Sequence, residues 1–412
     1  MSIRWRASAR SPWIRSALLP TLVASALALP MTAAADARDQ AKRIHDRIAG
    51  VPPSDATLQA MQDQIETNNN PVAAALIATQ DPAFYNVTLK NFAAPWTNRD
   101  GSVFVPLNDY TATVIGMVRD NVDFRELLSG DILYIGNGIS PGYSNSSNAH
   151  YEAMDAQATD LSTALTRVTQ SSVTGLPSNA TAGVLTSRAA SKAFFINGTN
   201  RAMFRFTMKY QLCHDMETVL DITRAPDRIR QDVSRSPGGD SRVFLNNCIG
   251  CHSGMDPMAQ SFAYYNFQHD AMNDPTGDAG MLVYNNTGAM DPVTGTRVVA
   301  KYFNNNTTFP FGFITPDDKW DNYWRHGRNA LFGWDDALPG TGEGAKSMGQ
   351  ELAHSQAFAE CQVEKVFANV CLRSPADAAD RAQVDAMVSS FAGAGYSLRQ
   401  VWAESAVYCM GD

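Results

Sequence analysis

Basic residues are few and scattered in this 412-residue chain, which has only 8 lysines among its 33 basic residues. The net charge is −8 at pH 7, and no run of Lys or Arg occurs beyond the N-terminal region. Nucleic-acid phosphates and anionic membrane surfaces are bound by clustered positive charge. The sequence therefore argues against both kinds of partner.

Cysteine is also rare, with 6 residues, and no long apolar run follows the N-terminal region. The composition still includes 44% hydrophobic and 18% charged residues. Those proportions exclude a disordered chain, a collagen-like chain and a small disulfide-stabilised knot. The length suffices for two or three domains with their own hydrophobic cores, and we expect no integral membrane segment in the mature protein.

The first 35 residues have the pattern of a secretory signal peptide. Four arginines and no acidic residue precede an apolar run over residues 16–30, and small residues lead to Ala35. A membrane-spanning helix would need about 20 apolar residues, whereas this run is shorter and contains Pro20 and Pro30. We expect cleavage after Ala35 and export to the periplasm or beyond. Loss of the four arginines from a net charge of −8 would leave −12.

Helical patterns dominate the rest of the sequence. Helices are predicted in segments 38–96, 109–119 and 153–168, and a module of three helices in 345–410, with Gly393–Gly395 between its last two. Ser54 is placed to cap a helix, and Asn68–Pro71 to end it. One β-hairpin is expected from 281–286 and 297–303, around a turn at 291–295.

Residues 248–252, Cys-Ile-Gly-Cys-His, have the C-x-x-C-H spacing of a c-type haem attachment site. Two cysteines three residues apart lie one above the other on a helical turn, so both thiols can bond to the vinyl groups of one porphyrin. The adjacent imidazole then reaches the iron from the same side. We therefore predict that Cys248 and Cys251 hold one covalent haem c and that His252 is an iron ligand.

Three other interpretations of the motif are weaker. A structural zinc site would need a second C-x-x-C or H-x-x-x-H pair, which the sequence lacks. A thioredoxin-like redox pair would need a βαβ context, whereas the surrounding pattern is helical. A disulfide between residues three apart has poor geometry.

The flanking residues predict how the motif is built into helices. Asp240 is placed to cap a helix that enters the motif through Val243 and Phe244, and Asp256-Pro257 has the pattern of a new helix start. The aromatic residues that follow are Phe262, Tyr264, Tyr265 and Phe267. We expect these four rings to cover an apolar macrocycle.

Four cysteines remain, and they should form disulfide bonds in an oxidising compartment. Cys371 ends the first predicted C-terminal helix and Cys409 ends the third. Consecutive helices reverse direction, so these two ends lie on the same side. This predicts the pair Cys371–Cys409 and leaves Cys213–Cys361. His214 next to Cys213 suggests a metal site, but no partner ligand lies nearby in the sequence, which favours a structural role.

The sixth iron position would distinguish an electron carrier from an enzyme. The candidate ligands are His326, Met348, Met290 and Met281, and an open position is a further alternative. His326 belongs to an aromatic-rich stretch from Phe309 to Trp334, which could line a haem pocket or form a core helix. The sequence leaves these alternatives open.

The run 248–258 resembles the C-x-x-C-H-x-x-M/I-D-P element of planctomycete-type cytochrome-c-domain proteins, a family of secreted bacterial haem proteins. Segments 182–186 and 204–213 resemble the region before that element, and 352–370 and 391–405 resemble the C-terminal helical module. The likeness covers roughly residues 180–412 and departs at Ala259, where many relatives have glycine, and in the stretch 300–335. It implies one covalent haem and electron transfer. Only Cys248, Cys251 and His252 carry over as functional residues.

Together these patterns predict a mainly α, multi-domain protein with one small β-hairpin. The expected parts are a signal peptide (1–35), an N-terminal helical domain (36–135), a polar linker with a helix (136–199), a cytochrome-c-like haem domain (200–340) and a C-terminal helical module (341–412). A Gly-, Ser- and Asn-rich loop at 136–149 marks one boundary.

The expected function is that of a secreted monohaem c-type cytochrome that exchanges electrons with a redox partner protein. One alternative is a haem-dependent peroxidase or oxygenase, since the chain is much longer than a bare electron carrier needs. A second alternative is an electron-feeding docking subunit of a secreted redox complex. The sequence predicts no catalytic residue for an organic substrate.

Overall fold

The computed structural model describes residues 36–230, 242, 244–303 and 313–411. Within these ranges the chain is mainly α-helical, and its strands form small two-stranded antiparallel sheets, which confirms the predicted mainly α fold class. No helix in these ranges is long and apolar enough to cross a lipid bilayer. The predicted signal peptide with its cleavage site, and Asp240, Val243 and Phe309, lie outside the described residues.

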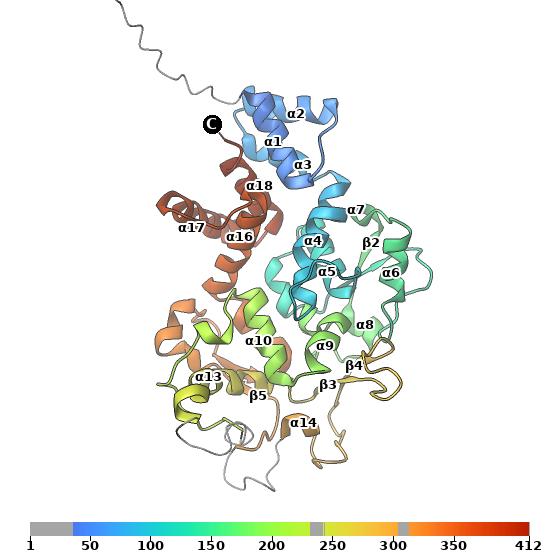
Figure 1. Ribbon diagram of the computed structural model, residues 1–412, viewed down its shortest axis with the longest axis vertical. Helices are drawn as coiled ribbons and strands as arrows, with labels where there is room; N and C mark the ends of the chain where they lie inside the picture. Colours follow the sequence, from blue (N-terminus) through green and yellow to red (C-terminus); the bar gives the residue numbers. More distant parts are fainter. Residues whose placement is uncertain (1–35, 231–241, 243, 304–312, 412) are drawn as a thin grey trace, which may run out of the picture. The chain divides into compact units, whose positions relative to one another are not determined.

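The first helices are α1 (Ala37–Ala49), α2 (Asp55–Glu66) and α3 (Pro71–Ala78), followed by η1 (Phe84–Leu89), α4 (Lys90–Ala93) and η2 (Ala94–Thr97). Helix α2 begins at the cap that the sequence predicted, and the helices on either side of it have caps of the same kind. The Ser54 hydroxyl accepts a hydrogen bond from the Thr57 N–H at 3.1 Å, and Asn70 caps α3 in front of Pro71. Helices α1 and α3 pack against α18 (Leu398–Tyr408), so the two ends of the described chain share one core (Figure 1).

The first sheet pairs β1 (Leu133–Gly136) with β2 (Leu165–Val168). The helix predicted over 153–168 is therefore wrong in its second half. Helix α6 (Ala149–Ala156) ends early, α7 (Leu161–Ala164) is a single turn, and β2 follows directly. Thr166 and Val168 are β-branched and favour extended backbone, and pairing with β1 outweighs the helical spacing.

Helix α5 (Asp109–Arg119) forms as predicted, and it anchors a segment that the sequence placed in a polar linker. That segment contains α8 (Gln170–Thr174), η4 (Gly183–Thr186) and α9 (Arg188–Phe195). The buried Asp109 carboxyl group accepts hydrogen bonds from the N–H groups of Arg188 (2.6 Å) and Ala189 (3.0 Å). Much of 180–195 is buried, and its apolar side chains belong to the hydrophobic core. The linker interpretation does not hold for this stretch.

The second sheet pairs β3 (Tyr265–Gln268) with β4 (Met281–Tyr284). The predicted hairpin between 281–286 and 297–303 is therefore wrong, and the later segment contains helix α14 (Ala300–Phe303). Arg297 still fixes the turn, since its guanidinium donates to the Asn285 carbonyl at 2.9 Å and the Asn285 amide donates back to the Arg297 carbonyl at 2.7 Å. Side-chain hydrogen bonds replace the backbone ladder that we expected.

The middle of the chain carries the C-x-x-C-H motif at the start of helix α13 (Ile249–Ala259), which packs against α10 (Asn200–Gln211). Short helical elements surround them: η5 (Met216–Thr218), η6 (Phe244–Cys248), η7 (Gln260–Phe262), η8 (Tyr323–Arg325) and η9 (Arg328–Phe332). Strands β5 (Lys319–Asp321) and β6 (Thr341–Glu343) form the third sheet. The described part of the aromatic-rich stretch is thus a strand and 3-10 turns rather than a core helix.

The C-terminal module contains four helices rather than the predicted three. They are α15 (Gly344–Ala353), α16 (Gln356–Cys371), α17 (Ala378–Gly393) and α18. The Ser355 hydroxyl accepts a hydrogen bond from the Phe358 N–H at 3.2 Å, and this cap starts a new helix where we expected one continuous helix.

Both predicted disulfide bonds are confirmed. The Cα atoms of Cys371 and Cys409 are 5.5 Å apart, and those of Cys213 and Cys361 are 5.3 Å apart. Cys213 is thus structural, as expected, and its bond joins the end of α10 to α16. The described residues belong to one compact unit; the domain boundaries predicted inside it stay predictions.

Candidate haem-attachment site

The C-x-x-C-H motif lies at the junction of η6 and α13. Cys248 ends η6 and occupies the N-cap position of α13, and Cys251 and His252 follow in the first turn. Both cysteines are free, half-buried thiols, whereas the other four cysteines are bonded in pairs. The local structure therefore presents two thiols and one imidazole on a single helical turn, as the spacing predicts.

The two thiols have apolar surroundings of different depth. Cys248 packs with Ile229, Phe244 and Ile249 in a small cluster apart from the main core. Cys251 packs against the main core, and burial raises the pKa of its thiol. The Cys251 thiol donates a long hydrogen bond to the Met216 carbonyl at 3.5 Å, and no charged side chain among the described residues hydrogen-bonds to either sulfur.

Exposed apolar side chains lie beside the motif. Leu220 (41% exposed), Ile222 (70%) and Leu245 (55%) remain open to solvent. Leu220 and Ile222 lie against Gly250, since a Cβ atom there would be 3.2 Å from Leu220 Cδ2 and 3.6 Å from Ile222 Cγ2. Isolated exposed hydrophobic residues are common, but here Leu220 and Ile222 lie against a residue of the motif and Leu245 precedes Cys248 in η6, so the three supply an apolar surface at this end of α13.

A glycine allows the aromatic segment to pack directly on the motif helix. A Cβ atom at Gly254 would lie 1.9 Å from Trp324 Nε1, so no larger residue fits there. Trp324 is fully buried, and η8, which contains it, contacts α13. Gly254 thus allows Trp324 to pack on α13, and this contact places the segment that carries His326 next to the motif helix.

The His252 imidazole is held by one defined hydrogen bond. Its Nδ1 atom lies 2.9 Å from Oδ1 of Asp256, one helical turn later, and the His252 side chain is 21% exposed. No described residue hydrogen-bonds to Nε2. A carboxylate can only accept, so Nδ1 carries a proton, and the tautomer that this hydrogen bond selects offers its lone pair at Nε2.

Asp256 is kept ionised by its partners. Its side chain is 3% exposed and accepts hydrogen bonds from Arg201 Nε (2.8 Å) and Nη2 (2.5 Å), and from the Arg230 N–H (3.3 Å). Burial alone would raise the pKa of Asp256, but the positive charge of Arg201 and the interaction with His252 outweigh it and hold this pKa well below its usual range. The carboxylate behind the imidazole is therefore available as an acceptor at any ordinary pH.

Two expectations about the residues after the motif are wrong. Asp256-Pro257 does not start a helix, because α13 continues through Pro257 to Ala259. The rings of Phe262 and Tyr265 do not face a macrocycle, because both are fully buried against protein, with Phe262 in edge contact with Phe195 and with Tyr265 itself. Tyr264 and Phe267 are also buried, at 6% and 3% exposure.

The candidates for the sixth iron position are in very different places. Met348 is fully buried in α15, Met290 is 64% exposed in the turn after β4, and Met281 is half-buried in β4 itself. His326 is exposed, and its neighbour Gly327 lies against Asp221, since a Cβ atom there would be 2.4 Å from Asp221 Oδ2. The Asp221 N–H in turn donates to the Gly250 carbonyl of the motif at 2.9 Å. Of the four candidates, His326 is on the segment that borders the motif.

Sequence reasoning missed Asp256 and Arg201 as parts of the site. The i, i+4 spacing from His252 to Asp256 on one helix was a usable signal, because such residues share a face. No local signal marks Arg201, which lies 55 residues before its partner. In the described parts of the chain no three His, Cys, Asp or Glu side chains gather into a group that could hold a metal ion by themselves. A haem iron would need only one such ligand here.

Comparison of the chain with models of protein families, with curated proteins and with solved structures finds no match.

Proposed function

We propose that this chain is a secreted monohaem c-type cytochrome that transfers electrons, in the planctomycete-type cytochrome-c-domain family. The observation that carries the proposal is the pairing of two free thiols with an imidazole whose Nδ1 is held by a buried carboxylate while Nε2 has no described partner. Iron-ligating histidines generally donate their second ring N–H to a carboxylate or carbonyl in this way.

Each residue has a distinct role in this proposal. Cys248 and Cys251 would hold one haem c through thioether bonds, and Nε2 of His252 would ligate its iron. Asp256 would fix the tautomer and the orientation of the imidazole, with Arg201 holding Asp256 in place. When bound, the iron would supply a one-electron ferric–ferrous couple, whose potential depends on ligand, burial and hydrogen bonding.

The proposal also includes export and a redox partner protein. Haem c is attached outside the cytoplasm, and the two disulfide bonds suit an oxidising compartment. A carrier of this kind needs a donor and an acceptor. The exposed apolar side chains next to the motif would leave part of the haem edge near the surface.

The test is expression of the full chain in a periplasm that contains a haem c maturation system. We expect a coloured protein whose Soret band survives acid–acetone extraction and whose mass exceeds that of the processed polypeptide by one haem. The double variant Cys248→Ser/Cys251→Ser should lose the covalent haem.

A matched control removes two other cysteines. The variant Cys371→Ser/Cys409→Ser lacks a disulfide bond but keeps the motif, so it should keep its covalent haem. A colourless wild-type protein with the mass of the polypeptide alone, or equal haem content in both double variants, would refute the proposal.

A further inference from the structure

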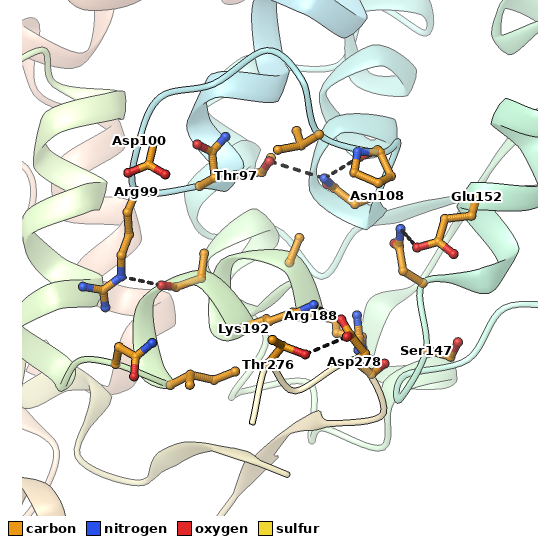
Figure 2. A pocket seen from close by; sticks show the side chains of 18 of the residues that line it. Thr97, Arg99, Asp100, Asn108, Ser147, Glu152, Arg188, Lys192, Thr276 and Asp278 are labelled. Atoms are coloured by element: carbon orange, nitrogen blue, oxygen red, sulfur yellow. Dashed lines mark hydrogen bonds and ion pairs between the residues drawn. The ribbon is translucent and has the colours of Figure 1, made fainter. Parts of the chain in front are cut away.

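A second candidate site is a cavity of about 920 Å³ that contains no residue of the C-x-x-C-H motif (Figure 2). Its walls come from four separate segments: residues 97–108, residues 147–152, helix α9 with the residues after it, and the loop 275–278. This volume is within the range of small-molecule sites, about 300–1,000 Å³.

The cavity walls are tied together by side-chain bonds to backbone carbonyls. Arg99 donates to the carbonyls of Ala193 (2.7 Å) and Phe194 (3.1 Å), so it joins the first wall to α9. Arg188 of α9 donates to the Gly280 carbonyl at 2.8 Å and to the Asp278 carbonyl at 2.6 Å, which joins α9 to the loop beyond it. Such cross-links fix the walls before any ligand arrives and lower the entropy cost of binding.

The charged groups of the cavity are balanced but not fully paired. Lys192 and Asp278 form an ion pair, whereas no described Lys or Arg pairs with the carboxylates of Asp100 and Glu152. Glu152 accepts one hydrogen bond, from the Asn148 amide at 3.1 Å. Figure 2 shows Asp100 and Glu152 on different sides of the cavity, with Lys192 and Asp278 along its floor.

These features limit the chemistry of a ligand. The described lining has no aromatic residue, so a nucleobase or flavin would find no stacking surface. Three cationic side chains (Arg99, Arg188 and Lys192) face three acidic ones (Asp100, Glu152 and Asp278), so the lining has no net charge and favours a neutral ligand over an ion. The carboxylates of Asp100 and Glu152 would accept hydrogen bonds from O–H groups, and Arg99, whose Nη1 has no described partner, can donate one to a hydroxyl oxygen. Val105, Pro106 and Ile196 supply apolar patches for C–H faces.

We propose that this cavity binds a neutral, polyhydroxylated small molecule of the mono- or disaccharide class. Asp100 and Glu152 accept hydrogen bonds from its hydroxyl groups, and Arg99 donates to a hydroxyl oxygen. The proposal does not depend on haem attachment, since the two sites share no residue.

The test is isothermal titration of the matured full-length protein with glucose, xylose, maltose and cellobiose. Glucuronate and glucosamine serve as charged probes of similar shape. We expect saturable binding of at least one neutral sugar. Glu152→Gln and Asp100→Asn should each weaken it about 10-fold, because a charged acceptor is replaced by a neutral one. Asp385→Asn, an exposed carboxylate on α17, should leave the affinity unchanged.

A third variant blocks the cavity without changing its charges. Ala193 lines the cavity from α9, and Ala193→Phe would place a ring in the space, so binding should be lost while the circular dichroism spectrum stays that of the parent. Three results would each overturn the proposal: no neutral sugar binds, binding is insensitive to Glu152→Gln and Asp100→Asn, or only the charged probes bind.

Discussion

Replacing Asp256 by alanine or asparagine separates two effects of one carboxylate. The side chain is 3% exposed and accepts hydrogen bonds from both His252 Nδ1 and the Arg201 guanidinium. Alanine removes the acceptor for both groups. Asparagine keeps an oxygen that can accept from Nδ1 but removes the negative charge.

The expected loss of stability follows from burial. Breaking a buried ion pair costs about 3–5 kcal/mol, and since Arg201 is 14% exposed we expect about 3 kcal/mol for Asp256→Ala. Asp256→Asn should cost less, about 1–2 kcal/mol, because one hydrogen bond to the imidazole survives. Urea unfolding followed by circular dichroism measures both values.

For the midpoint potential of the haem, Asp256→Asn is the more informative variant, because the potential depends on the charge of residue 256 rather than on its packing. A charge-assisted hydrogen bond is roughly twice as strong as a neutral one, so its loss should disfavour the ferric state by about 1 kcal/mol, or about 40 mV for one electron. Asp256→Asn should therefore raise the midpoint potential of the haem protein, measured by spectroelectrochemical titration. A lowered or unchanged potential, with full haem content, would refute the assigned role of Asp256.

Two further predictions concern residues away from the iron ligand. Burial raises the pKa of Asp318 from 3.8 to about 6. Ionisation of this carboxyl group is therefore less favourable in the folded than in the unfolded chain. The stability of the protein falls as the pH rises from 3.8 to 6, and it stays lower above pH 6. Asp318→Asn should therefore be about 2 kcal/mol more stable than the parent at pH 8, after allowance for solvent screening, and no more stable below pH 4 in urea unfolding; a gain at both pH values would contradict this. Gly254→Ala would push a methyl group into Trp324 and should cost about 1–3 kcal/mol. Gly393→Ala, with open space at its Cβ position, should instead gain about 0.5–1 kcal/mol, so equal unfolding midpoints for the two variants would contradict the packing argument.

Local signals in the sequence predicted local features of the fold. The cap at Ser54, the end of that helix before Pro71 and the span of α5 could be predicted because a cap, a helix stop and a hydrophobic period act within a few residues. The pairing of Cys371 with Cys409 was also predictable, although the number of helices was wrong. The additional helix α15 precedes α16, so α16, α17 and α18 are still three consecutive helices, with Cys371 at the end of the first and Cys409 at the end of the third, as the prediction required.

Pairing between distant segments could not be predicted in the same way. Residues 297–303 have a β-prone composition, yet β4 pairs with β3, which precedes it in the chain. Strand β2 likewise lies in a stretch with helical spacing, and only its partner β1 decides its conformation. In both cases the free energy that stabilises the strand comes from pairing with a partner strand, and the local sequence pattern contains no information about that partner.

Two buried acidic residues show most clearly where local reasoning stops. Asp109 and Asp256 both occupy positions that the sequence explains as helix-start residues, and the first does begin α5. A buried carboxyl group needs several hydrogen-bond donors, and both residues find theirs far along the chain. Asp109 accepts from the N–H groups that begin α9, and Asp256 accepts from Arg201 of α10. One of these bonds builds a wall of the cavity, and the other holds the imidazole of the motif. The spacing of Cys248, Cys251 and His252 therefore predicts the chemistry of the site, whereas the groups that orient it depend on tertiary contacts that only the folded chain provides.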